Sequence, residues 1–123
     1  PGKAERLRVL LGHPRTTLYV NLEEAGLICR TAFADAAAAA RGLLAQGASR
    51  VLVTAGPLPC ADGAPEGVIV RTPPAVTVQR ITGAGDTFMA AHIIAERRGD
   101  SRAAALSAAL DAAAEYISGE PAP

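Results

Sequence analysis

The residues best suited to chemistry lie in the run Thr82-Gly-Ala-Gly-Asp86, which separates a strand-like segment from an apolar helical segment. A turn of small residues at a helix N-terminus leaves backbone N–H groups for a ligand, and the helix dipole there favours an anion. A bound phosphate would repel the carboxylate of Asp86. That conflict disappears if Asp86 acts as a base beside the anion, as phosphoryl transfer requires.

Asp86 also has a purely structural explanation. A carboxylate in the first turn of a helix stabilises it by about 0.3–1 kcal/mol, and for an isolated Gly-x-Gly-Asp this explanation is the more frequent one. Here the threonine, both glycines and the strand-to-helix context occur together, which favours a functional role. His92 is about 240° around an ideal helix from Asp86 and is not expected to act with it.

Composition and charge exclude several classes of protein. The 123 residues are enough for one domain, and 12 basic residues balance 12 acidic ones. A chain without net charge has no bulk electrostatic attraction to nucleic acid or to an acidic membrane surface. No stretch of about 20 apolar residues predicts a membrane span.

The two cysteines, Cys29 and Cys60, lie in unrelated contexts without a Cys-x-x-Cys spacing, so neither a disulfide nor a zinc site is expected. The expected setting is the reducing cytoplasm. The chain begins without Met or a basic-then-apolar leader, which predicts no signal peptide and suggests a piece of a longer protein.

Short apolar segments alternate with helical patterns, which indicates a layered α/β domain with a partly parallel sheet. The expected strands are residues 17–21, 50–54, 67–71 and 75–79. The expected helices are residues 4–11, 22–28, 33–46, 84–99 and 101–117. A stiff turn over residues 55–59 is expected directly after the second strand.

Three sequence elements, in order, resemble the ribokinase-like (PfkB) carbohydrate kinase family. Residues 82–88, Thr-Gly-Ala-Gly-Asp-Thr-Phe, are similar to its C-terminal signature, Asn21-Leu-Glu-Glu24 to its Asn-x-x-Glu element, and Val53-Thr-Ala-Gly56 to its Val-Thr-x-Gly turn. The resemblance covers roughly residues 17–119. It implies the C-terminal half of a ribokinase-like layered α/β fold, with residues 1–119 as the nucleotide-binding portion and residues 120–123 as a tail.

The resemblance implies a role for each matched position. Asp86 would take the proton from a substrate hydroxyl as it attacks the γ-phosphate of ATP. The backbone N–H groups of Gly83, Ala84 and Gly85 would form the anion hole for the transferring phosphoryl group. The residues implied to act around Mg²⁺, largely through water, are Asn21 and Glu24. Those implied to contact the nucleotide are Thr54, Gly56, Thr82 and Asp111, the last on a helix that covers the adenine.

On the residues alone, Glu24 is an ordinary first-turn acid and Asn21 an ordinary turn former at a strand end, and only the combination of elements favours a metal site. Three positions also depart from the family pattern. Arg80 replaces an acid that helps to hold a monovalent cation, so potassium activation is doubtful, because a guanidinium cannot ligate potassium. Pro59 replaces a glycine in the nucleotide loop, and Asp111 replaces an Asn of the last helix.

The function that follows is ATP-dependent phosphoryl transfer to a hydroxyl of a sugar or nucleoside, with a slight preference for a nucleoside such as pseudouridine from overall similarity. Family members carry an additional N-terminal half with most of the substrate-binding residues. We therefore expect weak or no activity from this chain alone, and a partner that is either the missing half or another chain, including a second copy paired through an exposed sheet edge. The alternative is a truncated, non-catalytic nucleotide-binding or assembly module derived from such a kinase.

Overall fold

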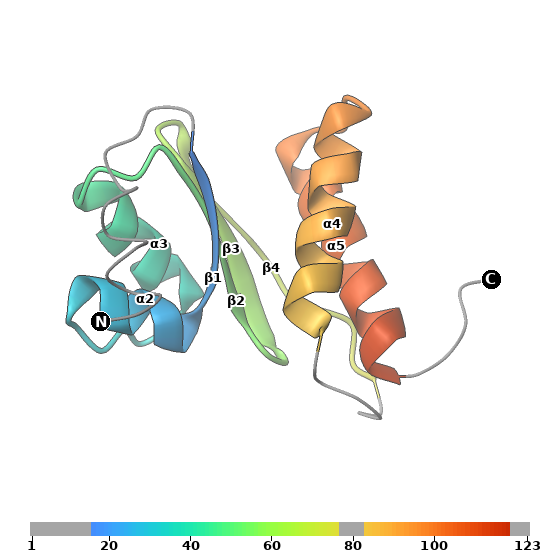
Figure 1. The fold of residues 1–123 in the computed structure, drawn as a ribbon, viewed down its shortest axis with the longest axis horizontal. Helices are drawn as coiled ribbons and strands as arrows, with labels where there is room; N and C mark the ends of the chain where they lie inside the picture. The colour runs from blue at the N-terminus through green and yellow to red at the C-terminus, as the bar shows by residue number, and fades with distance from the viewer. Residues whose placement is uncertain (1–15, 77–82, 119–123) are drawn as a thin grey trace. The chain divides into compact units, whose positions relative to one another are not determined.

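The computed structural model of the chain describes residues 16–76 and 83–118. It comprises two compact units, Pro1–Val70 and Arg71–Pro123. The first unit holds a sheet with two helices, and the second holds a pair of helices (Figure 1). None of the helices in the described segments combines the length and hydrophobicity needed to cross a membrane.

The sheet of the first unit is mixed, as expected. Its strands are β1 (Thr17–Asn21), β2 (Arg50–Ala55), β3 (Leu58–Ala64) and β4 (Gly67–Arg71), in the spatial order β1-β2-β3-β4. β1 and β2 are parallel, whereas β2 and β3 are antiparallel. The chain passes from β1 to β2 through α2 (Leu22–Cys29) and α3 (Ala36–Ala45), which cover the same face of the sheet (Figure 1).

Local signals set the ends of these helices. Asp35 is extended and its carboxylate accepts the N–H of Ala38 at 2.8 Å, so α3 begins at Ala36 rather than at residue 33. Phe33, two residues before that cap, folds back over the helix, since a Cβ on Gly42 would lie 2.6 Å from its ring. α3 ends before Gly47, whose φ of 107° suits glycine.

Small side chains allow α3 to lie close to the sheet. A Cβ added to Gly63 of β3 would meet Ala40 and Leu44 of α3 at 3.2 Å. The residues that form this core alternate along the strands and recur on one side of each helix. They include Leu18, Val20, Ala25, Ile28, Ala36, Ala39, Ala40, Leu43, Val51, Val53 and Ala61. The alanine-rich composition therefore serves close helix-on-sheet packing.

The expected turn directly after the second strand is present, but it is shorter than residues 55–59. A tight turn at Gly56 and Pro57 joins β2 directly to β3, with Ala55 paired opposite Leu58. Gly56 has a φ of 60°, which a short hairpin turn uses and glycine accepts without strain. Pro59 was expected in the turn, but it is exposed near the start of β3, where proline is tolerated.

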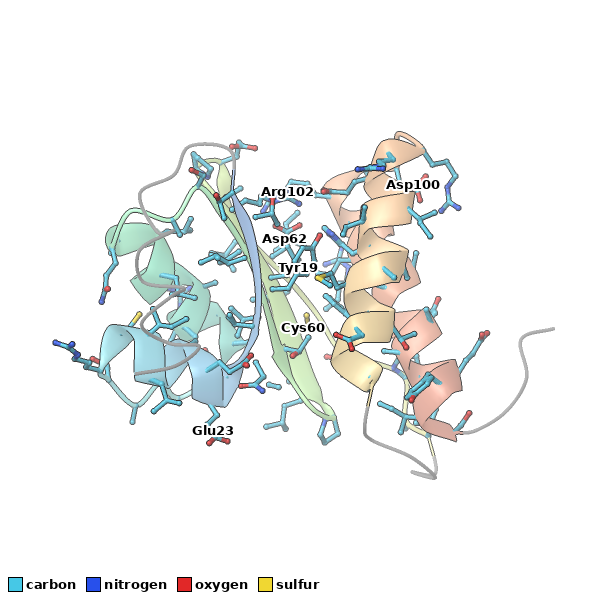
Figure 2. The ribbon with its side chains drawn as sticks, viewed as in Figure 1. Tyr19, Glu23, Cys60, Asp62, Asp100 and Arg102 are labelled. Atoms are coloured by element: carbon cyan, nitrogen blue, oxygen red, sulfur yellow. The ribbon has the colours of Figure 1, made fainter. Side chains whose placement is uncertain are left out.

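A carboxylate of β3 forms an ion pair with the neighbouring strand β2. Asp62 is fully buried, and Arg50 of β2 donates to it through Nε at 3.0 Å and through a terminal nitrogen at 2.7 Å (Asp62 is labelled in Figure 2). Two parallel hydrogen bonds from one guanidinium are the geometry that best compensates a buried carboxylate. β3 therefore departs from the apolar pattern by which buried strands are recognised.

The second unit consists of α4 (Ala84–Arg97) and α5 (Arg102–Ser118), packed along each other (Figure 1). Gly99, with a φ of 95°, lies in the turn between them, and the hydroxyl of Ser101 accepts the N–H of Ala104 at 3.2 Å. Both helices and the Ser101 cap were expected. The first two residues of the expected strand 75–79 are not in a strand. The rest of that segment, the expected helix 4–11, Arg80 and Thr82 lie outside the described residues.

Candidate functional site

Asn21 and Glu24 form a reciprocal cap where β1 passes into α2. The Asn21 side-chain oxygen accepts the backbone N–H of Glu24 at 2.7 Å, and a carboxylate oxygen of Glu24 accepts the backbone N–H of Asn21 at 2.9 Å. This capping box fixes both side chains at the carboxyl end of a parallel strand. The Asn-x-x-Glu spacing is itself a signal for such a cap, so the structural explanation of the motif is present whatever else the pair does.

Thr54 and Gly56 lie beside this cap. Thr54 is the register partner of Asn21 on the neighbouring parallel strand. Ligands of open α/β sheets bind outside the carboxyl ends of such strands. A Cβ on Gly56 would have no atom within 4 Å, so the backbone of this turn is open to approach.

An open hollow of about 670 Å³ runs along this edge of the sheet. Its walls come from the start of α2, from residues 31–33 and from the β2–β3 turn, and they include Asn21, Thr54 and Gly56. Glu23 projects from the first turn of α2 at its rim (Figure 2), whereas Glu24 is not part of its lining. Leu27 and Leu58 give the hollow an exposed apolar wall that the sequence did not predict.

In the second unit, the start of α4 has the geometry of an anion site. Gly83 is the N-cap residue, with φ 93° and ψ −3°, and no side chain caps the helix. The carbonyl of Gly83 accepts the backbone N–H and the hydroxyl of Thr87, both at 3.0 Å. The N-terminal N–H groups of α4 thus lack the side-chain oxygen that usually occupies them, and the dipole favours an anion in its place.

Asp86 lies in the first turn of α4, where it and Gly85 are exposed, whereas Gly83 and Ala84 are half-buried. Asp111 is exposed on α5. The expected anion-hole residues, Gly83 to Gly85, and the expected base, Asp86, are thus consecutive at the start of α4.

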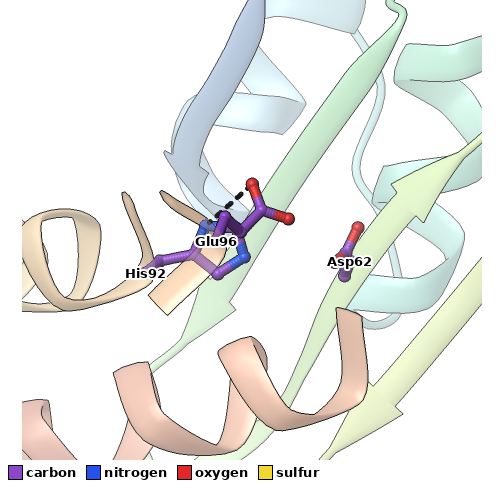
Figure 3. A group of neighbouring side chains, drawn as sticks. All are labelled: Asp62, His92 and Glu96. Carbon is purple, nitrogen blue, oxygen red and sulfur yellow. Dashed lines mark ion pairs between the residues drawn. The ribbon is translucent and has the colours of Figure 1, made fainter. Parts of the chain in front are cut away.

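His92 is buried on α4, where it stacks on Phe88 with ring centroids 6.2 Å apart. Its Nδ1 lies 3.9 Å from a carboxylate oxygen of Glu96, one helical turn further along (Figure 3). His92 was not expected to act with Asp86, and within α4 it contacts Phe88 and Glu96.

The sequence profile of the pfkB family carbohydrate kinases matches residues 2–120, nearly the whole chain. The chain belongs to the pfkB family of carbohydrate kinases. Both the expected family and the expected ribokinase-like α/β fold are confirmed. No curated protein matches the sequence.

Solved structures of pfkB-type kinases resemble this chain over most of its length. Phosphofructokinase-2 from Escherichia coli, in complex with substrates and products, has a TM-score of 0.81 at 23% identity, over 94% of this chain and 39% of that one. Arabidopsis thaliana ribokinase, complexed with ribose and ATP, has a TM-score of 0.79 at 27% identity, over 89% and 36%. A ribokinase II from E. coli, in complex with ATP and Mg²⁺, has a TM-score of 0.75 at 23% identity, over 93% and 36%. The chain thus spans less than two fifths of each of these kinases.

Proposed function

We propose that this pfkB-family chain supplies the ATP site, the anion hole and the catalytic base of a kinase that phosphorylates a hydroxyl of a sugar or nucleoside. The observation that carries the proposal is the uncapped, left-handed start of α4 at Gly83, followed at once by the exposed carboxylate of Asp86. Kinases of similar fold that were crystallised with ATP and ribose, or with ATP and Mg²⁺, support the choice of substrates.

In the proposed reaction the acceptor hydroxyl attacks the γ-phosphorus of ATP. The new O–P bond forms as the bond to the bridging β,γ-oxygen breaks, ADP leaves, and the hydroxyl proton passes to Asp86. The N–H groups of Gly83, Ala84 and Gly85 hold the negative charge of the transferring phosphoryl oxygens. Donors fixed in place before the reaction stabilise that charge without reorganisation.

The residues at the end of β1 fit a magnesium ion that keeps most of its water. The cap engages the single side-chain oxygen of Asn21 and one carboxylate oxygen of Glu24, and Mg²⁺ needs few direct protein ligands because it dehydrates reluctantly, so both residues would act on its waters. Bound there, Mg²⁺ would neutralise charge on the β- and γ-phosphate oxygens. We assign the phosphates and ribose to Thr54, Gly56 and Thr82, and the adenine to the helix that carries Asp111. Arg80 continues to argue against a monovalent cation.

A non-catalytic module that binds nucleotide or assists assembly is the second candidate. The chain spans only 39% of phosphofructokinase-2, and orientation of the acceptor is a large part of phosphoryl-transfer catalysis. Turnover would then need another segment or another chain, including a second copy, to hold the acceptor.

Two measurements on the full chain separate these functions. Calorimetric titration with Mg·ATP should release heat, and ATP consumption with a panel of sugars and nucleosides tests for an acceptor, with weak turnover expected from this chain alone. Asp86→Asn should bind Mg·ATP but lose at least about 100-fold in turnover, the lower range for a general base. Binding without turnover on any acceptor would favour the module, whereas unchanged turnover in Asp86→Asn would remove the base assignment. Absence of nucleotide binding would refute the kinase and the nucleotide-binding form of the module, and would leave only the assembly role.

A further inference from the structure

Tyr116, near the end of α5, lies against Gly83 at the start of α4. A Cβ added to Gly83 would lie 2.6 Å from the Tyr116 hydroxyl oxygen and 3.1 Å from its Cζ atom. The three atoms closest to that position all belong to Tyr116. The phenol therefore occupies the space that any larger residue at position 83 would need for its own side chain.

Gly83 is thus held from two sides. Thr87 of α4 binds its carbonyl oxygen through both the backbone N–H and the side-chain hydroxyl, while Tyr116 of α5 packs on its α-carbon. The φ of 93° belongs to the left-handed region, which side-chain-bearing residues rarely adopt. Glycine is required here both for its backbone conformation and for the approach of the phenol.

The start of α4 needs such support because it carries no side-chain cap. In most helices the capping oxygen both binds the first N–H groups and fixes the entering chain. An anion hole cannot use that device, since a capping oxygen would compete with the ligand for the same donors. Its donors must nevertheless be in place before the reaction, because that preorganisation is the source of their effect.

We propose that Tyr116 is a positioning residue for the Gly83–Gly85 hole. Its ring fixes Gly83, and so keeps the N–H groups that follow directed at the phosphoryl group, without binding that group itself. This inference rests on the proposed function and assigns the end of α5 a task separate from the adenine contact expected of Asp111.

The experiment compares Tyr116→Ala, Tyr116→Phe and Ile117→Ala in the full chain. Ile117 is the matched control, because it is half-buried on the same turn of α5. None of its atoms is among the three closest to the position of a Cβ on Gly83. Amide resonances of Gly83, Ala84 and Gly85 are recorded by NMR without ligand. The dissociation constant for Mg·ATP and the melting temperature are then measured for each variant.

Tyr116→Ala should shift those amide resonances and weaken Mg·ATP binding by about 10-fold or more, since small displacements of a positioning group have large effects. Tyr116→Phe removes the hydroxyl oxygen nearest to Gly83 but keeps Cζ, so its resonances and affinity should fall between those of the wild type and Tyr116→Ala. Ile117→Ala should lower the melting temperature as Tyr116→Ala does, but leave the resonances and the affinity unchanged. If Tyr116→Ala does not fold, Tyr116→Leu takes its place in the comparison.

Each contrary result has a separate meaning. Unshifted resonances in Tyr116→Ala would overturn the positioning role, whatever the affinity for Mg·ATP. Shifted resonances with unchanged affinity would show a contact that does not serve the hole, and would overturn the inference as well. Failure of the wild-type chain to bind Mg·ATP would instead refute the proposed function, and with it any role for Tyr116 in that function.

Discussion

Replacing Arg50 by methionine removes the guanidinium that binds Asp62 through two hydrogen bonds of 3.0 and 2.7 Å, and keeps an unbranched apolar stem in its place. Arg50 is 20% exposed in its side chain, whereas Asp62 is fully buried. The substitution therefore removes two charge-assisted hydrogen bonds from a buried carboxylate. The double variant Arg50→Met/Asp62→Leu removes the carboxylate as well.

The size of the effect follows from that asymmetry. Two unit charges 4 Å apart attract each other by about 4 kcal/mol at an effective dielectric constant near 20, and desolvation of both groups offsets much of this gain. Loss of one partner of a buried pair costs about 3–5 kcal/mol, while replacement of both by apolar groups is often neutral. A cost of that size is a large part of the roughly 5–15 kcal/mol that stabilises a domain.

Urea unfolding followed by circular dichroism measures the effect. With a slope of about 1–3 kcal/mol per molar urea, a cost of about 3–5 kcal/mol in Arg50→Met should lower the midpoint by about 1–5 M, and Arg50→Met/Asp62→Leu should recover most of that loss. A single substitution that costs less than about 1 kcal/mol, the range of exposed pairs, would refute the argument. The argument would also be refuted if the double variant cost as much as Arg50→Met and Asp62→Leu added together, because the effects of independent sites add.

Two further predictions concern the same unit. Burial, and then the charge of Asp62, raise the pKa of Cys60 from 9.0 to about 12. The folded state therefore holds the thiol proton more tightly than the unfolded state, so the free energy of unfolding should fall as the pH rises from about 9 toward 12. Cys60→Ala should remove this part of the pH dependence of the urea midpoint. Asn21→Ala deletes the α2 cap and should cost about 1 kcal/mol by the same assay, whereas Glu23→Ala, exposed in the same turn, should stay within about 0.5 kcal/mol.

Local chemistry made most of the helices predictable. Asp35 and Ser101 are caps, Gly47 and Gly99 follow helix ends, and each of these signals lies within a few residues of the boundary that it sets. The run 82–88 was informative for the same reason, because its glycines and Asp86 define a helix start and a family signature within one turn of chain.

Features that depend on distant residues could not be predicted. β3 was missed because Pro59 and the buried Asp62 break its pattern, and the pairing of Asp62 with Arg50 joins residues on two different strands. The contact between Tyr116 and Gly83 joins the end of one helix to the start of another. No periodicity in the sequence predicts such a contact, since it depends on how α4 and α5 pack.

The capping box at Asn21 and Glu24 has a consequence for how this family changes over time. Because the two side chains start α2, a descendant that no longer turned over substrate would still be selected to keep them, since a lost cap costs about 1 kcal/mol of stability. Asp86 is exposed and caps no helix through its side chain, so selection for folding restrains it less. In lineages that lose catalysis, Asp86 should therefore be substituted first. The Asn-x-x-Glu element should be retained after the kinase activity is lost.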